Sequence, residues 1–206
     1  MRKTLVLFAS VMVLQAEELP AGAEKPISST TTRNAVRFDA QYRWRNYAQE
    51  SFLSPGAFFA SVMPAVGDHA GDRPAEFGQG WDAFGERLWR RAATYQLQTA
   101  LYHSSAAVLG SETGYRRCEC EGGWRRLGYA VSRTFVTRTQ GGTTIPNVAL
   151  WGGSFGGGMI ATAWYPDRYR ATSEGVRFGG YQLGARTVVN VFREFGPELK
   201  RLFGRR

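Results

Sequence analysis

The sequence predicts an all-α protein, a helical bundle with one long central helix and a glycine-ridged helical hairpin in its C-terminal part. From Phe77 onward, apolar residues recur three or four positions apart, which is the spacing of one helix face. Later in the chain, small residues recur every four positions, which lets two helices approach closely. Of the 206 residues, 43% are hydrophobic and 21% charged, and this balance excludes a disordered low-complexity protein.

The first 34 residues are expected to precede the folded domain. Arg2 and Lys3 come before the uncharged run Thr4–Leu14, which is too short to span a bilayer and typical of a signal peptide. Cleavage is expected after Ala16, with Ala23 as a second candidate, and a buried N-terminal helix is the alternative. The expected organisation is a signal peptide at 1–16, a flexible tether at 17–34 and a single mainly helical domain at 35–206.

The beginning of this domain is ambiguous. Apolar and polar residues alternate from Ala35, which is typical of a strand, but no second run alternates comparably. We therefore expect a short helix that ends at Ser54-Pro55-Gly56, then a small apolar helix over Gly56–Val66 that Pro64 interrupts. Residues 68–74 are expected to form a loop.

The long central helix is predicted from Glu76 to Gly110. Phe77, Trp81, Phe84 and Leu88 stand at helical spacing, and the same stripe continues downstream. A bend is expected near Gly85. A polar loop over 111–123 and a short amphipathic helix over 124–137 follow.

The glycines after Pro146 predict a tight helical hairpin, with helices at 147–165 and 174–195. Glycine inside a helix costs about 1 kcal/mol relative to alanine, so close helix packing has to compensate. Irregular glycine loops are the alternative, and Gly196-Pro197 is expected to break the chain before a basic end. The small residues of the packing ridge are Ala149, Gly153, Gly157, Ala161, Gly175, Gly179, Gly180 and Gly184.

Residues 148–165 carry no charged side chain, and the first one after them is Asp167. A membrane-inserted glycine-zipper hairpin is therefore an alternative. Two features weigh against it. The five glycines lower the apolar drive, and the partner helix carries Arg177, Arg186 and Arg193, which are costly to place in a bilayer.

Ser154 lies in Gly152-Gly153-Ser154-Phe155-Gly156, a G-x-S-x-G pattern that resembles the nucleophile elbow of the α/β-hydrolase family. That resemblance implies a serine esterase or hydrolase. However, the family order places the histidine after the serine, and both histidines, His69 and His103, precede Ser154. We expect no catalytic residue, and Ser154 remains the alternative nucleophile.

Cys118 and Cys120 form a candidate disulfide, because two cysteines of an exported chain should pair. A redox role is an alternative to a structural loop staple. We expect neither a metal site nor a cofactor, since two thiols and two distant histidines have no recognised ligand spacing.

The formal charge is +9, and nearly all the cations are arginines. This favours acidic partners, and the candidate anion contacts are Arg116, Arg117, Arg125 and Arg126. Solvated helix faces are the alternative. Anionic lipid or an envelope polymer is the expected partner, a homo-oligomer is open, and nucleic acid is not expected because exported proteins seldom meet it.

The order of these features resembles a family of uncharacterised exported bacterial proteins, most clearly in Gly78-Gln79-Gly80-Trp81-Asp82-Ala83-Phe84-Gly85. The resemblance implies a location in the cell envelope, periplasmic or membrane-peripheral, and a mainly helical fold, without catalytic residues. The expected function is therefore non-enzymatic association through a basic, aromatic-rich surface.

Overall fold

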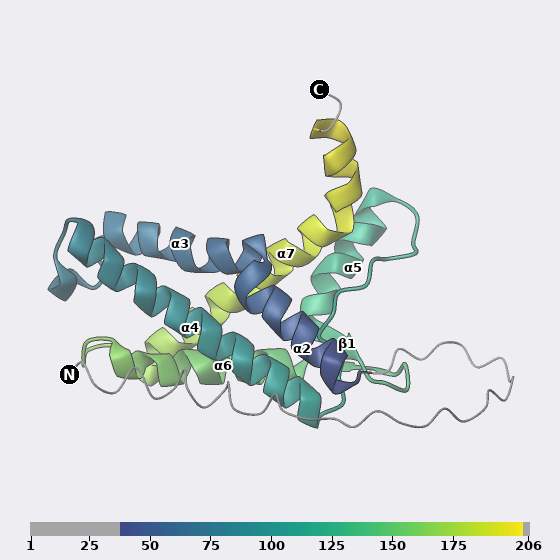
Figure 1. Ribbon diagram of the computed structural model, residues 1–206, viewed down its shortest axis with the longest axis horizontal. Helices are drawn as coiled ribbons and strands as arrows, with labels where there is room; N and C mark the ends of the chain where they lie inside the picture. Colours follow the sequence, from purple (N-terminus) through teal and green to yellow (C-terminus); the bar gives the residue numbers. More distant parts are fainter. Residues whose placement is uncertain (1–37, 204–206) are drawn as a thin grey trace, which may run out of the picture. The chain divides into compact units, whose positions relative to one another are not determined.

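The computed structural model describes residues 38–203, and helices make up most of them (Figure 1). The all-α prediction is confirmed. The expected signal peptide and tether lie outside the described residues. The helices are α2 (Ala40–Ala48), α3 (Pro55–Ala70), α4 (Trp81–Val108), α5 (Gly123–Phe135), α6 (Val148–Ala161) and α7 (Val176–Phe203). Short helical turns are η1 (Gln49–Leu53), η2 (Ala75–Phe77), η3 (Thr162–Trp164) and η4 (Ala171–Gly175).

Helix α4 is the centre of the bundle, as expected from its length. It lies between α3 and α6 in the view of Figure 1 and packs against both. Helix α6 packs in turn on α7, and α7 on α5. One buried cluster, Tyr102, Ala106, Ala149 and Leu150, joins α4 to α6.

Polar side chains at the helix starts explain where several helices begin. The Asp39 carboxylate accepts a hydrogen bond from the Tyr42 amide at 2.7 Å, and the Ser54 hydroxyl accepts one from the Ala57 amide at 3.1 Å. Asn147 does the same for the Leu150 amide at 3.3 Å. Helix α4 starts later than predicted, at Trp81, because Gly78 and Gly80 adopt positive φ angles of 68° and 102°.

Two predicted chain breaks are wrong. Helix α3 continues through Pro64 to Ala70, and α7 continues through Gly196-Pro197, although its last turns point in a new direction (Figure 1). Proline has no amide hydrogen, so the carbonyl of Arg193, four residues before Pro197, loses its helical donor. The Arg117 guanidinium supplies another donor at 3.1 Å.

A small antiparallel hairpin, β1 (Val136–Arg138) with β2 (Thr144–Pro146), was not expected. Thr137 pairs with Ile145, so the last residues of the helix predicted to 137 are extended. Each strand has three residues, which is too short for strand periodicity to show in the sequence.

The glycine ridge of α6 packs on the central helix α4. A Cβ atom at Gly153 would lie 2.5 Å from the backbone nitrogen of Tyr102, and one at Gly157 would lie 2.9 Å from the Cα atom of Gln98. Ala149 and Ala161, in line with them, are buried. These positions therefore permit close backbone approach, as predicted, but to α4 rather than to the other arm of the hairpin.

The hairpin itself uses a different set of glycines. A Cβ atom at Gly158 would lie 2.4 Å from the Gly175 carbonyl oxygen, and one at Gly179 would lie 2.3 Å from the Phe155 ring. Gly180 and Gly184 face open space, so their expected place in the ridge is wrong. Helix α7 turns these two residues away because only one of its faces meets α6.

Candidate binding site

Charged side chains are buried between the helices, and the most central of them is Glu50 on η1. Glu50 forms an ion pair with Arg186 of α7, and its Oε2 atom lies 3.3 Å from Nε2 of His103 on α4. Burial by itself would raise the pKa of Glu50, but Arg186 and His103 outweigh it and lower this pKa to about 2. Arg186 also stacks on the Tyr102 ring at 4.7 Å.

A second buried carboxylate, Glu112, follows α4 in the chain. Its side chain accepts hydrogen bonds from Nε of Arg116 at 2.6 Å and from a terminal nitrogen of Arg133 at 3.4 Å. Its carbonyl accepts from the Thr137 hydroxyl at 2.8 Å, which ties this loop to β1. The charge of Glu112 is therefore compensated inside the protein.

Between these two clusters lies a polar pocket with a volume of about 390 Å³. Helix α2 and η1 provide Tyr42, Asn46 and Gln49, the loop after α4 provides Thr113 and Tyr115, and α7 provides Arg193. Glu50, Glu112 and Arg116 also line it, each already in an ion pair.

Arg193 differs from Arg116, the other arginine that lines this pocket. Within residues 38–203 its guanidinium forms no ion pair and no hydrogen bond, and only its carbonyl is engaged, by Arg117. Burial, together with the nearby Arg186, lowers the pKa of Arg193, but an arginine remains cationic in proteins. The pocket therefore presents a guanidinium that pairs with no carboxylate of the described residues.

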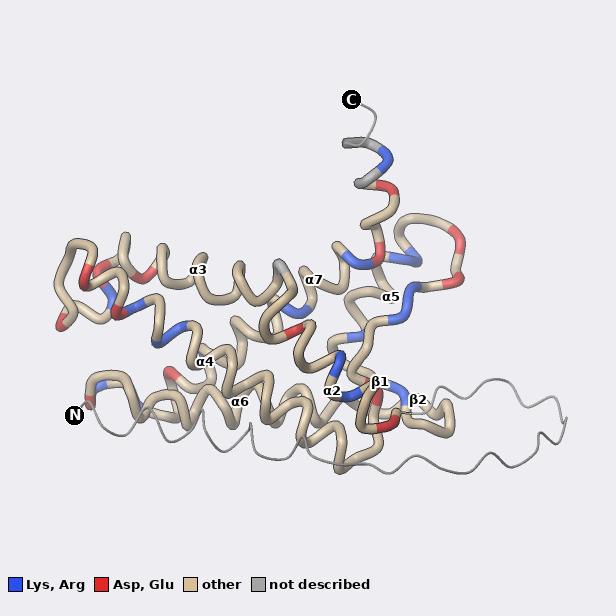
Figure 2. Tube along the Cα trace, in the orientation of Figure 1, with Lys and Arg blue, Asp and Glu red and all other residues tan. Residues whose placement is uncertain are grey.

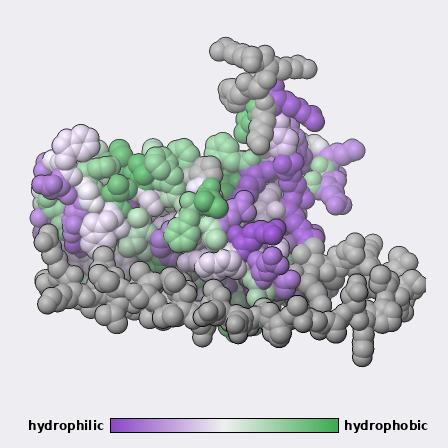
Figure 3. All heavy atoms as spheres, viewed as in Figure 1, coloured by the Kyte–Doolittle hydropathy of each residue, from purple (hydrophilic) through white to green (hydrophobic). Residues whose placement is uncertain are grey.

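On the other side of Arg193 runs an apolar groove of about 660 Å³ between α3 and α7. Its walls are Leu53, Phe59, Ala60 and Met63 on one side and Ala185, Val188, Val189 and Phe192 on the other. Figure 3 shows hydrophobic atoms gathered on the surface over α3. Gln49 and Arg193 line both the groove and the polar pocket, so the two spaces meet at these residues.

The predicted anion contacts are mostly engaged within the protein. Arg126 pairs with Glu194 at 2.8 Å and Glu198 at 2.7 Å, and Arg117 binds the Arg193 carbonyl. Figure 2 shows the basic residues of the loop before α5 beside acidic residues of α7. Arg125 is exposed and has no ion pair in the described part of the chain. Of the four arginines predicted to contact anions, one, Arg116, lines the polar pocket.

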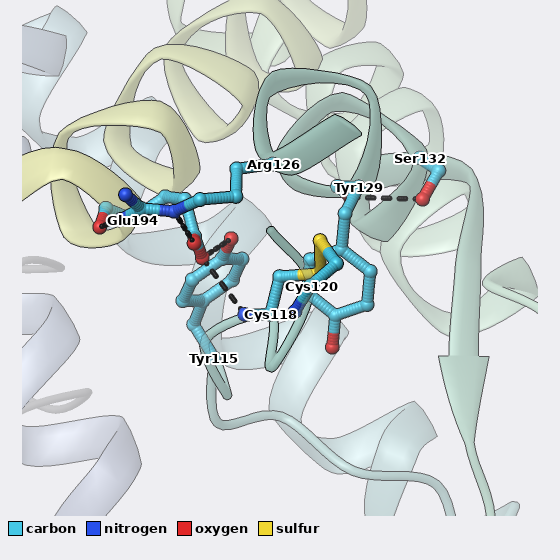
Figure 4. Close-up of a disulfide and its surroundings, with 7 residues drawn as sticks. All are labelled: Tyr115, Cys118, Cys120, Arg126, Tyr129, Ser132 and Glu194. Carbon is cyan, nitrogen blue, oxygen red and sulfur yellow. Dashed lines mark hydrogen bonds and ion pairs between the residues drawn. A yellow bond between two sulfur atoms is a disulfide. The ribbon is translucent and has the colours of Figure 1, made fainter. Parts of the chain in front are cut away.

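The two cysteines form a disulfide, and their loop is fastened to α7 through Glu194 (Figure 4). The Cys118 amide donates to this carboxylate at 3.0 Å, and the Tyr115 hydroxyl donates to it at 2.8 Å. Together with the Arg126 contact, these bonds hold the disulfide loop against the helix. The disulfide therefore lies in a loop that these bonds hold beside α7.

The nucleophile-elbow interpretation of Ser154 is wrong. The elbow requires a strand that turns sharply into a helix, whereas Val148–Ala161 is one helix and Ser154 lies inside it. Ser154 is 0% exposed, and its hydroxyl has no hydrogen-bond partner among the described residues. A substrate therefore has no access to it in this structure.

Among the helices of residues 38–203, none combines the length and the hydropathy needed to cross a membrane. Family models, curated proteins and solved structures were compared with this chain, and none of them matches it.

Sequence reasoning missed Glu50 and Arg193 as site residues. In the sequence, Arg186 and Arg193 indicate only that membrane insertion of their helix is costly. Their spacing of seven residues, which places both on one face of a helix, was the signal available in the sequence. Glu50, which neutralises Arg186, is distant in the chain, and Arg193 has no such partner in the described residues. Both results depend on how distant elements pack together.

Proposed function

We propose that this protein is a non-enzymatic, exported envelope protein that associates with the surface of anionic membranes. The observation that carries the proposal is a set of exposed, large apolar side chains on η1 and α3. Phe52 is 65% exposed and Phe58 is 61% exposed, and Leu53, Phe59 and Met63 are exposed as well. Exposed apolar surface of this kind is typical of an interaction site.

Charge supports a membrane as the partner. The chain carries a formal charge of +9, or +7 after removal of residues 1–16 with Arg2 and Lys3, and basic residues near an anionic bilayer gain about 1 kcal/mol each. Aromatic and aliphatic side chains that enter the interface add the burial of apolar area. Export is proposed from the basic start and the apolar run Thr4–Leu14, and from the resemblance to exported bacterial proteins.

Vesicle co-sedimentation tests the proposal. The protein should sediment with vesicles that contain phosphatidylglycerol, less with pure phosphatidylcholine, and less at high salt because salt screens the charges. The double variant Phe52→Ser/Phe58→Ser should lose most of this binding. Val108→Ser is the matched control, since Val108 is 87% exposed on another helix end. Equal sedimentation of all three proteins would refute the proposed surface.

A homo-oligomer that covers the same face is the competing outcome. Light scattering of the protein without vesicles distinguishes it. The protein could be a dimer that Phe52→Ser/Phe58→Ser converts to a monomer, without binding vesicles. In that case the partner of this surface is a second copy of the chain and not a membrane.

A further inference from the structure

The groove between α3 and α7 has the properties of a ligand site. Its volume of about 660 Å³ falls within the range of small-molecule sites, and its walls are almost entirely apolar. Several of these walls remain open to solvent: Phe59 is 57% and Phe192 60% exposed. A hydrocarbon chain laid in the groove would remove this apolar surface from water.

The residues at one end of the groove indicate the chemistry of the ligand's head group. Arg193 stands where the groove meets the polar pocket, and its guanidinium has no partner within residues 38–203. Gln49, from η1, lines the same junction. A guanidinium binds a carboxylate through two parallel hydrogen bonds, and such charged bonds are stronger than neutral ones.

The surroundings of the polar pocket are positive overall, which suits an anionic head group. Its two carboxylates, Glu50 and Glu112, are paired with arginines of the protein itself, Glu50 with Arg186 and Glu112 with both Arg116 and Arg133. Arg193 pairs with no carboxylate of residues 38–203, so its guanidinium is available to the head group of a ligand.

We infer that the groove binds the hydrocarbon chain of a long-chain fatty acid, with the carboxylate held by Arg193 at the junction with the polar pocket. This inference rests on the proposed association with lipid and names a lipid class and a residue for it. The ligand lies along α3 and α7 as a single molecule. The groove shares Leu53, Phe59 and Met63 with the proposed membrane surface, whereas Phe52 and Phe58 do not line it and are assigned to the bilayer contact alone.

Palmitate binding by the delipidated full chain tests the inference. Displacement of a fluorescent fatty acid by palmitate, below its micelle concentration, should be saturable with one site per chain. Arg193→Met keeps the length of the side chain and removes its charge, and palmitate should then bind about tenfold or more weakly. Binding of hexadecanol, which has the same chain without a charge, should change little in this variant.

Two further variants complete the test. Ala185→Phe places a ring in the groove and should weaken palmitate and hexadecanol alike. Arg170→Met removes an exposed arginine without an ion pair in the described residues and should leave both affinities unchanged. Circular dichroism confirms that each variant is folded, and Arg193→Lys, which keeps the charge, should retain part of the palmitate affinity.

The inference is overturned if the wild-type chain does not bind palmitate, if Arg193→Met binds it as tightly as wild type, or if a dimer closes the groove. Failure of the proposed function is distinct from these results. If the protein binds palmitate but does not sediment with anionic vesicles, the membrane proposal is refuted and the fatty-acid site stands. If it sediments with vesicles but does not bind palmitate, only the membrane proposal stands.

Discussion

Glu50 and Arg186 are 136 positions apart in the sequence and form an ion pair that is almost closed to solvent, with side-chain exposures of 7% and 8%. The pair joins η1, at the beginning of the bundle, to α7 at its end, and His103 of α4 lies against the same carboxylate. Three elements therefore converge on one buried charge. Removing it should affect the stability of the whole bundle.

We expect Glu50→Gln to lower the free energy of unfolding by about 3–5 kcal/mol, since it leaves the Arg186 charge buried without its partner. Urea unfolding followed by circular dichroism measures this change. Glu76→Gln is the matched control, because the Glu76–Arg168 pair is exposed and such pairs contribute about 0–1 kcal/mol. Similar losses in the two variants would contradict a special role of the buried pair.

The stability of the protein should also depend on Glu50 at acid pH. The pKa of Glu50 is about 2 in the folded protein, below its ordinary value of 4.5. The unfolded chain therefore takes up the proton first, so the contribution of Glu50 is complete above about pH 4.5 and is lost as the pH falls towards 2. Unfolding free energies measured from pH 6 to pH 2 should converge for wild type and Glu50→Gln. A constant difference over this range would contradict the assignment.

Neighbouring glycines of α6 should respond in opposite ways to alanine. Gly153→Ala places a methyl group 2.5 Å from the Tyr102 backbone nitrogen, so α4 and α6 must separate and the protein should lose about 1–3 kcal/mol. Gly152→Ala points into open space and should gain up to about 1 kcal/mol from helix propensity. Thermal unfolding of the two variants measures both signs. Two stabilised variants would show that the ridge is not in close contact.

Glu194 should hold the disulfide loop against α7. It is 0% exposed and accepts hydrogen bonds from the Arg126 and Tyr115 side chains and from the Cys118 amide. Tyr115→Phe should cost about 0.5–1.5 kcal/mol and increase hydrogen exchange in residues 115–126, because one of these bonds is lost.

The control for this loop is Tyr129→Phe, a tyrosine near the disulfide in Figure 4 that makes no side-chain hydrogen bond through its hydroxyl in the described residues. Its hydrogen exchange should match that of wild type. Faster exchange in Tyr129→Phe than in Tyr115→Phe would contradict an anchoring role of the Tyr115 hydroxyl.

The helical class and the central helix could be predicted because they depend on local spacing. Phe77, Trp81 and Phe84 stand at the spacing of one helix face, but Phe77 lies in η2 before α4 and Trp81 is 87% exposed, so this spacing predicted a helix and not its buried face. The glycines four apart report close backbone approach. The partner of that approach could not be predicted. Gly153 packs on Tyr102 instead of on α7, since a ridge specifies how near a neighbour can come and not which helix it is.

The sequence by itself determined that this chain forms amphipathic and glycine-rich helices, because those signals lie within a few turns of one helix. Only the tertiary structure decided which charges are neutralised and which stay available. Arg186 finds Glu50 and Arg193 finds no partner within residues 38–203, although both belong to α7. Ion pairing acts over a few ångströms in space, and distance along the chain carries no information about it.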